Sequence, residues 1–190
     1  MTDDAETGKV GLTSNSLSGG ERNRIFFRRD GNYVDLSLVS GADFTEDGRS
    51  FVLFDADNDG WLDMGITSPN HPRFRIVKNM IKETSCSTNR NVELILVGGH
   101  DAAKPTDQQW SPRDAYGATV KVTTGNQTRM FQLSGGQGLS TVNAKRIHIG
   151  LGDVETIDKL EVFWPSGKTT VRENVEAKDR LEILEKSTES

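Results

Sequence analysis

The chain has 190 residues and a net charge of −5, and 34% of its residues are hydrophobic. This length suits one average domain or two small ones, and the hydrophobic share is too high for a disordered chain. The negative charge argues against nucleic acid and an anionic membrane surface as partners. No apolar run approaches the roughly 18 residues of a membrane-spanning helix, so we expect no membrane insertion. The single cysteine excludes an intrachain disulfide and a cysteine-based zinc cluster.

Residues 1–21 are polar, rich in Ser, Gly and Thr, and without periodicity, which predicts a flexible leader. The acidic N-terminus does not resemble a signal peptide. Between residues 22 and 80, short apolar runs alternate with turn signals, which is typical of β-strands. The expected strands there are residues 24–27, 33–36, 50–54, 62–67 and 74–77.

Residues 90–186 carry the clearest strand patterns. Strict alternation of apolar and polar residues appears at 118–122, 147–151 and 160–164, with further strands expected at 92–97, 127–133 and 181–183. Strands at spacings of about 8–12 residues favour a sandwich or barrel. Residues 175–184 come nearest to a helical pattern but lack a cap. We therefore expect an all-β chain that ends in a β-sandwich.

The strongest chemical signal is an acidic loop between two expected strands. Its carboxylates alternate with other residues, and without a cation they would repel one another. A hard divalent cation such as Ca²⁺ takes six to eight oxygen ligands from a flexible loop of this kind. The expected ligands are the carboxylates of Asp55, Asp57, Asp59 and Asp63 and the carbonyl of Trp61, with Gly60 allowing the turn. The alternative is an acidic, solvated loop without metal.

The pattern matches the first half of an EF-hand loop and then departs from it. The twelfth position is Ile66, where an EF-hand has a bidentate Glu. The flanking segments have strand patterns and not helical ones. The pattern therefore predicts a calcium loop at a β-turn.

One phrase points to a different function and is discounted. Residues 133–137 spell the signature sequence of ABC transporter ATPases, but the Gly-Lys-Thr at 167–169 lacks the first glycine of a Walker A loop, which would fall at Val162. Residues 165–168 are better explained as a hairpin turn. We therefore expect no nucleotide hydrolysis.

Two polar loops carry the side chains best suited to ligand binding, because recognition in β-sandwiches falls on loops held by a rigid scaffold. The candidate ligand-binding residues are Trp110, Arg113, Asp114 and Tyr116 in the first loop and Gln137, Ser140 and Asn143 in the second. Trp110 is either a stacking platform for a sugar or peptide, or a lid over the core.

Two segments resemble known families. Residues 49–63 look like an FG-GAP/VCBS repeat, which forms propeller blades and carries calcium in the same loop. Residues 116–120, 136–140, 148–152 and 160–168 are similar to the ASPIC/UnbV domain, as in the C-terminal part of cartilage acidic protein-like proteins. The resemblance implies a propeller-like, calcium-binding segment at 22–80 and an ASPIC/UnbV-like sandwich at 90–186. A propeller needs several blades, so the chain is expected to be a piece of a longer protein or a shortened relative.

Together these patterns favour a non-catalytic module for recognition or adhesion. The resemblance implies an extracellular or cell-envelope location and a glycan or extracellular protein as partner. One alternative is a carbohydrate-active hydrolase, with Asp114 and Asp153 as candidate acid and base. Another is a structural piece that assembles with missing propeller blades or with itself.

Overall fold

The computed structural model describes residues 20–69, 71–84, 89–100, 109–136, 138 and 140–186. Contacts divide the chain into two units. The first comprises Met1–Phe51 and Met64–Val77, and the second comprises Val52–Asp63 and Lys78–Ser190. By its contacts, the acidic loop therefore belongs to the same unit as the C-terminal part of the chain. Most of the expected leader lies outside the described residues.

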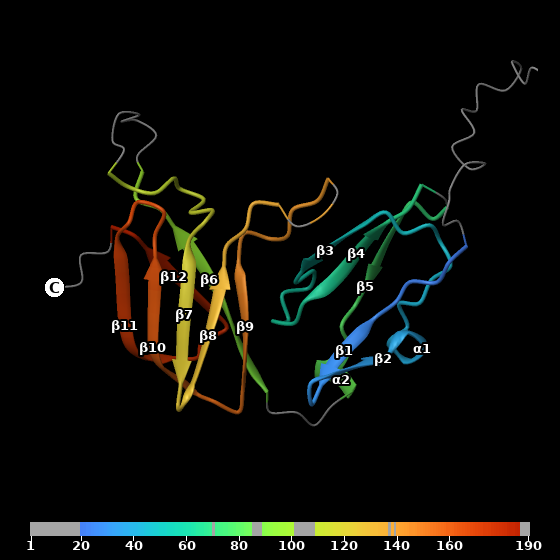
Figure 1. The fold of residues 1–190 in the computed structure, drawn as a ribbon, viewed down its shortest axis with the longest axis horizontal. Coiled ribbons are helices and arrows are strands. Elements are labelled where there is room, and N and C mark those ends of the chain that lie inside the picture. The colour runs from blue at the N-terminus through green and yellow to red at the C-terminus, as the bar shows by residue number, and fades with distance from the viewer. Residues whose placement is uncertain are drawn as a thin grey trace, which may run out of the picture. The chain divides into compact units, whose positions relative to one another are not determined.

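The described residues form twelve strands and two short helices, which confirms the expected all-β fold (Figure 1). The first-unit and boundary elements are β1 (Phe26–Arg29), β2 (Asn32–Asp35), α1 (Ser37–Ser40), β3 (Ser50–Phe54), β4 (Asp63–Thr67) and β5 (Phe74–Val77). The remaining elements are α2 (Ile81–Thr84), β6 (Arg90–Val97), β7 (Thr119–Thr124), β8 (Gln127–Gln132), β9 (Ile147–Gly152), β10 (Thr156–Phe163), β11 (Thr169–Glu176) and β12 (Arg180–Leu184).

The N-terminal strands form small open sheets. Strands β1 and β2 pair as an antiparallel hairpin, and β3, β4 and β5 form a three-stranded sheet in that order. The hairpin turns at Asp30 and Gly31, whose φ values of 51° and 82° suit the Asp-Gly pair. No closed propeller is formed by the residues that the structure describes.

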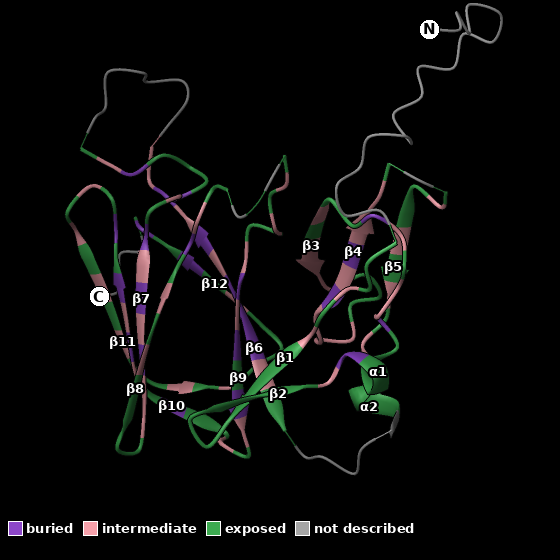
Figure 2. Cartoon of the chain, turned by 45° about the vertical axis from the view of Figure 1, so that its right-hand side comes forward, coloured by how far each residue is buried: buried purple, intermediate pink, exposed green. Residues whose placement is uncertain are grey.

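The hairpin and the following helix expose large apolar side chains. Phe26 is 58% exposed, Tyr33 is 70% exposed, and Leu38 and Val39 on α1 are each 81% exposed. All eight residues of β1 and β2 are exposed, as the green ribbon in Figure 2 shows. The apolar side chains of these strands and of α1 therefore form exposed surface and not a core. A two-stranded hairpin by itself is only marginally stable in water.

The C-terminal strands form two sheets over one core. One sheet has the order β11-β10-β7-β8, and the other has the order β12-β6-β9. Strand β6 pairs parallel with β12 and antiparallel with β9. The two sheets share one hydrophobic cluster, drawn in purple along the strands in Figure 2. Its largest fully buried apolar residues are Val92, Leu94, Val120, Val122, Ile149, Ile157, Leu160, Val162 and Ile183.

The phrase at residues 165–168 forms the turn between β10 and β11, as expected. The backbone N–H of Trp164 donates to the Lys168 carbonyl at 2.9 Å, and Gly167 has a φ of 86°. A hairpin turn at this position is consistent with discounting a phosphate-binding loop. Among the described residues, no helix is long and apolar enough to cross a membrane.

Candidate cation site and ligand-binding loops

The acidic loop between β3 and β4 brings three carboxylates together. One oxygen from each of Asp55, Asp57 and Asp63 lies within 4.8 Å of the other two. Asp63 is buried, with 2% of its surface exposed, whereas Asp57 is exposed. Three carboxylates at this distance repel one another, and a bound cation offsets that repulsion.

The loop backbone is held by the same carboxylates. The Asp55 side chain accepts hydrogen bonds from the N–H groups of Asp59 and Gly60 at 3.0 and 2.9 Å. Asp63 accepts from the N–H of Asn79 at 2.8 Å, which joins the loop to the chain after β5. Gly60 has a φ of 90°, a value that glycine adopts without strain. Carboxylates already oriented in this way lose little freedom on binding an ion.

Asp59 and Trp61 lie differently from the three clustered carboxylates. Asp59 Oδ1 accepts the N–H of Trp61 at 2.8 Å, and Asp59 is not part of the three-carboxylate cluster. Its other oxygen, Oδ2, is buried and has no hydrogen-bond partner among the described residues. A buried carboxylate oxygen without a partner is unfavourable, and a cation ligated there would satisfy it. The Trp61 residue is half-buried.

A lysine ammonium group lies against the edge of the cluster. Lys78 Nζ is 2.8 Å from Asp57 Oδ2 and 2.6 Å from Glu83 Oε1. The hydrogen bonds that Lys78 donates to these two carboxylates raise the pKa of Lys78, and the bond to Asp57 lowers the pKa of Asp57. The donor set is made only of oxygens, which suits a hard cation such as Ca²⁺. The residues present therefore fit the expected ion.

A cavity of about 450 Å³ lies beside the loop, within the second unit. It is lined by Asp55, Asn58, Asp59, Gly60, Lys82, Glu93, Asp179 and Arg180. Glu93, on the central strand β6, is 3% exposed and forms ion pairs with Arg146 at 3.0 Å and Arg180 at 3.2 Å. Arg180 also donates to Asn58 Oδ1 at 3.4 Å, so one side chain contacts both the sheet and the acidic loop.

Trp110, the main candidate platform, is half-buried and already has neighbours on its ring. The ammonium groups of Lys168 and Lys186 lie 4.4 and 5.1 Å from the ring centroid. A Cβ atom added to Gly99 would lie 2.8 Å from the indole, so the ring packs directly on the backbone at that glycine. These contacts indicate a fixed ring position, which both the lid and the platform interpretation allow.

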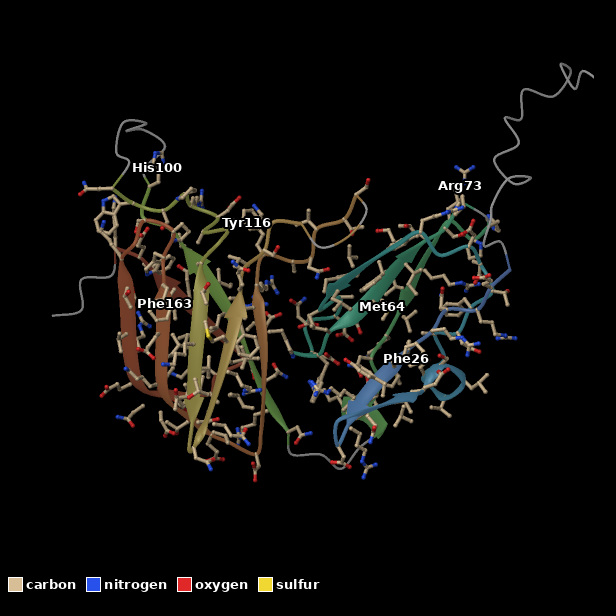
Figure 3. The ribbon with its side chains drawn as sticks, in the orientation of Figure 1. Phe26, Met64, Arg73, His100, Tyr116 and Phe163 are labelled. Atoms are coloured by element: carbon tan, nitrogen blue, oxygen red, sulfur yellow. The ribbon has the colours of Figure 1, made fainter. Side chains whose placement is uncertain are left out.

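The rest of the first loop combines exposed and packed side chains. Arg113 and Asp114 are exposed, and Asp114 forms an ion pair with Lys145 at 2.6 Å that raises the pKa of Lys145. Tyr116, labelled in Figure 3, packs against the hydrophobic core, with the Lys145 ammonium 5.7 Å from its ring centroid. Asp153, the other hydrolase candidate, is exposed immediately after β9.

The second loop contacts the end of strand β3, just before the acidic loop. Asn143 Oδ1 accepts the N–H of Leu53 at 2.8 Å. Asn143 also lines a cavity of about 210 Å³ together with Ser134, Arg146 and other residues of the second unit. Ser140 is exposed and has a φ of 57°. Gln137 lies outside the described residues.

A hydrogen-bonded network around Glu185, next to the segment that carries Trp110, was not expected from the sequence. Glu185, on the strand end after β12, is 7% exposed and accepts hydrogen bonds from Ser111 and Ser166. These residues are distant in sequence, and no spacing pattern connects them. In the sequence, the one sign of this network is the acidic residue that follows the alternating run 181–184.

A comparison with known families finds the C-terminal resemblance again. Residues 108–190 match the family described as ASPIC and UnbV, which covers β7 to β12 of the second unit. A search of curated proteins found no match. The FG-GAP/VCBS resemblance of residues 49–63 stays a prediction.

Proposed function

We propose that this chain is a non-catalytic recognition module in which Ca²⁺ fixes the acidic loop on an ASPIC/UnbV-type domain. The observation that carries the proposal is the meeting of Asp55, Asp57 and Asp63 oxygens within 4.8 Å in a loop that is already organised by hydrogen bonds. Ca²⁺ would be held by these carboxylates, with Asp59 and the Trp61 carbonyl as further proposed ligands. The ion would neutralise the loop and restrain its backbone.

The proposed role is recognition because the loops of the second unit present polar and aromatic side chains on a rigid core. The partner would be a glycan or an extracellular protein, and the location extracellular or in the cell envelope, as the ASPIC/UnbV resemblance suggests. A hydrolase needs a proton-donating carboxyl group in a cleft. Asp114 is instead exposed and paired with Lys145, which gives the hydrolase alternative less support.

A second candidate function is assembly with a partner surface. It is favoured by the exposed apolar side chains of Phe26, Tyr33, Leu38 and Val39 in the first unit. Contiguous exposed apolar surface in a soluble protein marks an interaction site. The covering surface would be further blades or a second copy of the chain.

The cation site is tested by replacing one exposed ligand. Asp57→Asn removes a carboxylate charge from the cluster, whereas Asp153→Asn removes the same charge from an exposed position outside the loop. Isothermal calorimetry should show one Ca²⁺ site in the wild type and in Asp153→Asn. Its affinity should fall about tenfold or more in Asp57→Asn, since a loss of about 1.4 kcal/mol gives that factor. Equal affinities in the two variants would contradict the proposed site.

A further inference from the structure

The indole of Trp110 is the meeting point of two lysine side chains. Lys168 precedes β11 and Lys186 follows β12, yet both ammonium groups lie within 5.1 Å of one ring centroid. Neither forms a salt bridge with a carboxylate in the part of the chain that the structure describes. The Lys168 ammonium donates to the backbone carbonyl of Gln109. The two ammonium groups thus lie near one ring, and neither is ion-paired with a carboxylate among the described residues.

A buried carboxylate fixes the segments that present this cluster. Glu185 accepts the N–H groups of Gly99 and Ser111 at 2.7 and 2.8 Å and the Ser111 hydroxyl at 3.0 Å. It also accepts the hydroxyl of Ser166, whose N–H donates to the Ser111 hydroxyl at 3.1 Å. Ser111 is next to Trp110, Ser166 lies two residues before Lys168, and Glu185 is next to Lys186.

The consequence of this network is a preorganised surface. Binding groups carried by segments that are locked by buried hydrogen bonds hold their geometry and lose little entropy on binding. The strand end after β12, the β10–β11 turn and the loop before β7 are joined by one carboxylate. Trp110, Lys168 and Lys186 therefore form a built cluster on a rigid base.

The chemistry of the cluster indicates the class of ligand. An anionic group placed near both ammonium groups would remove their mutual repulsion. The indole offers an apolar, planar neighbour with a defined position. A sugar ring bearing a carboxylate or a sulfate presents both an anion and an apolar face of C–H groups, whereas an acidic peptide side chain presents only the anion.

We propose that Trp110, Lys168 and Lys186 form a binding site for an anionic saccharide. This inference rests on the proposed recognition role of the chain but not on its cation site. It extends the sequence-based candidates, which included Trp110 but neither lysine.

The test measures binding of the full chain to sulfated and carboxylated polysaccharides, with heparin and polygalacturonate as the two probes. Binding to at least one probe is expected, and the probe that binds identifies the anion. Lys168→Gln and Lys186→Gln should each lower the affinity about fivefold, as loss of about 1 kcal/mol predicts. A double Lys→Arg variant at the two positions keeps both charges and should retain binding.

Lys178→Gln is the matched control, because it removes the same charge at the other end of β11. Lys178 is exposed and lies on the order of 25 Å from Lys168 by the rise of an extended strand. The affinity of Lys178→Gln for the polysaccharides should equal that of the wild type. Dextran tests for an uncharged sugar, and polyglutamate tests for an acid without a sugar ring.

Three outcomes would overturn the inference. In the first the chain binds neither polysaccharide, and in the second Lys168→Gln and Lys178→Gln lower the affinity equally. The third is that dextran or polyglutamate binds as tightly as the anionic polysaccharides. Each leaves the calcium proposal standing, since calorimetry with Ca²⁺ tests that separately. If the wild type binds the saccharide but does not bind Ca²⁺, only the cation site is rejected.

Discussion

At the scale of single residues, Glu185 shows how one buried charge organises distant segments. Burial raises the pKa of Glu185, but hydrogen bonds from Ser166, Gly99 and Ser111 more than offset this effect and leave the pKa below its ordinary value. A buried carboxylate is tolerated only when such donors replace water. Its charge is therefore a structural requirement of the surface that presents Trp110.

The first prediction at this scale is the acid sensitivity of Glu185. Because its pKa is lower in the folded state, its contribution to stability is present above the unfolded value of about 4.5 and is lost as the pH falls through the folded pKa. Glu185→Gln places an amide N–H₂ against N–H donors and should destabilise the protein by about 1–3 kcal/mol at neutral pH. Urea unfolding at pH 7 and pH 3 measures both effects.

The control is Glu182→Gln, an exposed position on β12 that is close to Glu185 in sequence. That variant should stay within about 0.5 kcal/mol of the wild type at pH 7. Glu185→Gln should also lose less stability than the wild type between pH 7 and pH 3. A full wild-type acid response in Glu185→Gln would show that another group is responsible.

Residue-level prediction from the sequence worked where the signal was local. The alternating Asp residues share one short loop, so their proximity could be anticipated, and Asp55, Asp57 and Asp63 do meet. The network of Glu185 could not be anticipated, because its partner Ser111 is 74 positions away. Only the fold brings these residues together.

At the scale of secondary structure elements, alternation predicted the central strands well. Ala118, Val120 and Val122 were expected on one face and are all buried. Strand β11 was missed, and its position explains why. It lies at the edge of its sheet, and its polar sequence over Thr169–Glu176 shows no clear apolar face. An edge strand that pairs mainly through its backbone leaves little trace in side-chain patterning.

The prediction at this scale concerns the junction between β6 and the loop that carries Trp110. A Cβ atom on Gly98 would lie 2.0 Å from the Pro112 carbonyl oxygen, and the Gly98 N–H donates to the Arg113 carbonyl at 3.0 Å. Gly98→Ala must therefore displace backbone and should destabilise the protein by about 1–3 kcal/mol in thermal or urea unfolding.

Gly150→Ala on β9 is the control, because a Cβ atom there would meet nothing within 4 Å. Alanine also reduces the freedom of the unfolded chain, so this variant should be neutral or slightly stabilising. Similar destabilisation in the two variants would mean that the close approach at Gly98 is not responsible.

At the scale of the whole molecule, the contacts of the acidic loop were the feature least visible in the sequence. The loop follows an N-terminal strand, and the resemblance placed it in the segment 22–80. In the structure, residues 52–63 group with the C-terminal unit. Two contacts illustrate this grouping, from Leu53 to Asn143 and from Asn58 to Arg180. Both span 90 residues or more, beyond the reach of pattern analysis.

This grouping leads to a prediction about where calcium stabilises the chain. If Ca²⁺ binds only the folded second unit, an ion concentration of 100 times the dissociation constant adds about 2.7 kcal/mol. Amides that exchange through unfolding of that unit should then exchange about 100-fold more slowly. The expected segments are the loop 52–63 and strands β6 and β9. Glu93 on β6 lines the cavity beside the loop, and Asn143, just before β9, accepts the N–H of Leu53. Hydrogen exchange followed by mass spectrometry, with Ca²⁺ or with chelator, measures this directly. The β1–β2 hairpin should exchange at the same rate in both conditions, and Asp57→Asn should reduce the difference in β6 and β9 about tenfold at the same Ca²⁺ concentration. Protection confined to the hairpin, or a calcium effect of wild-type size in Asp57→Asn, would mean that the ion acts somewhere other than the acidic loop.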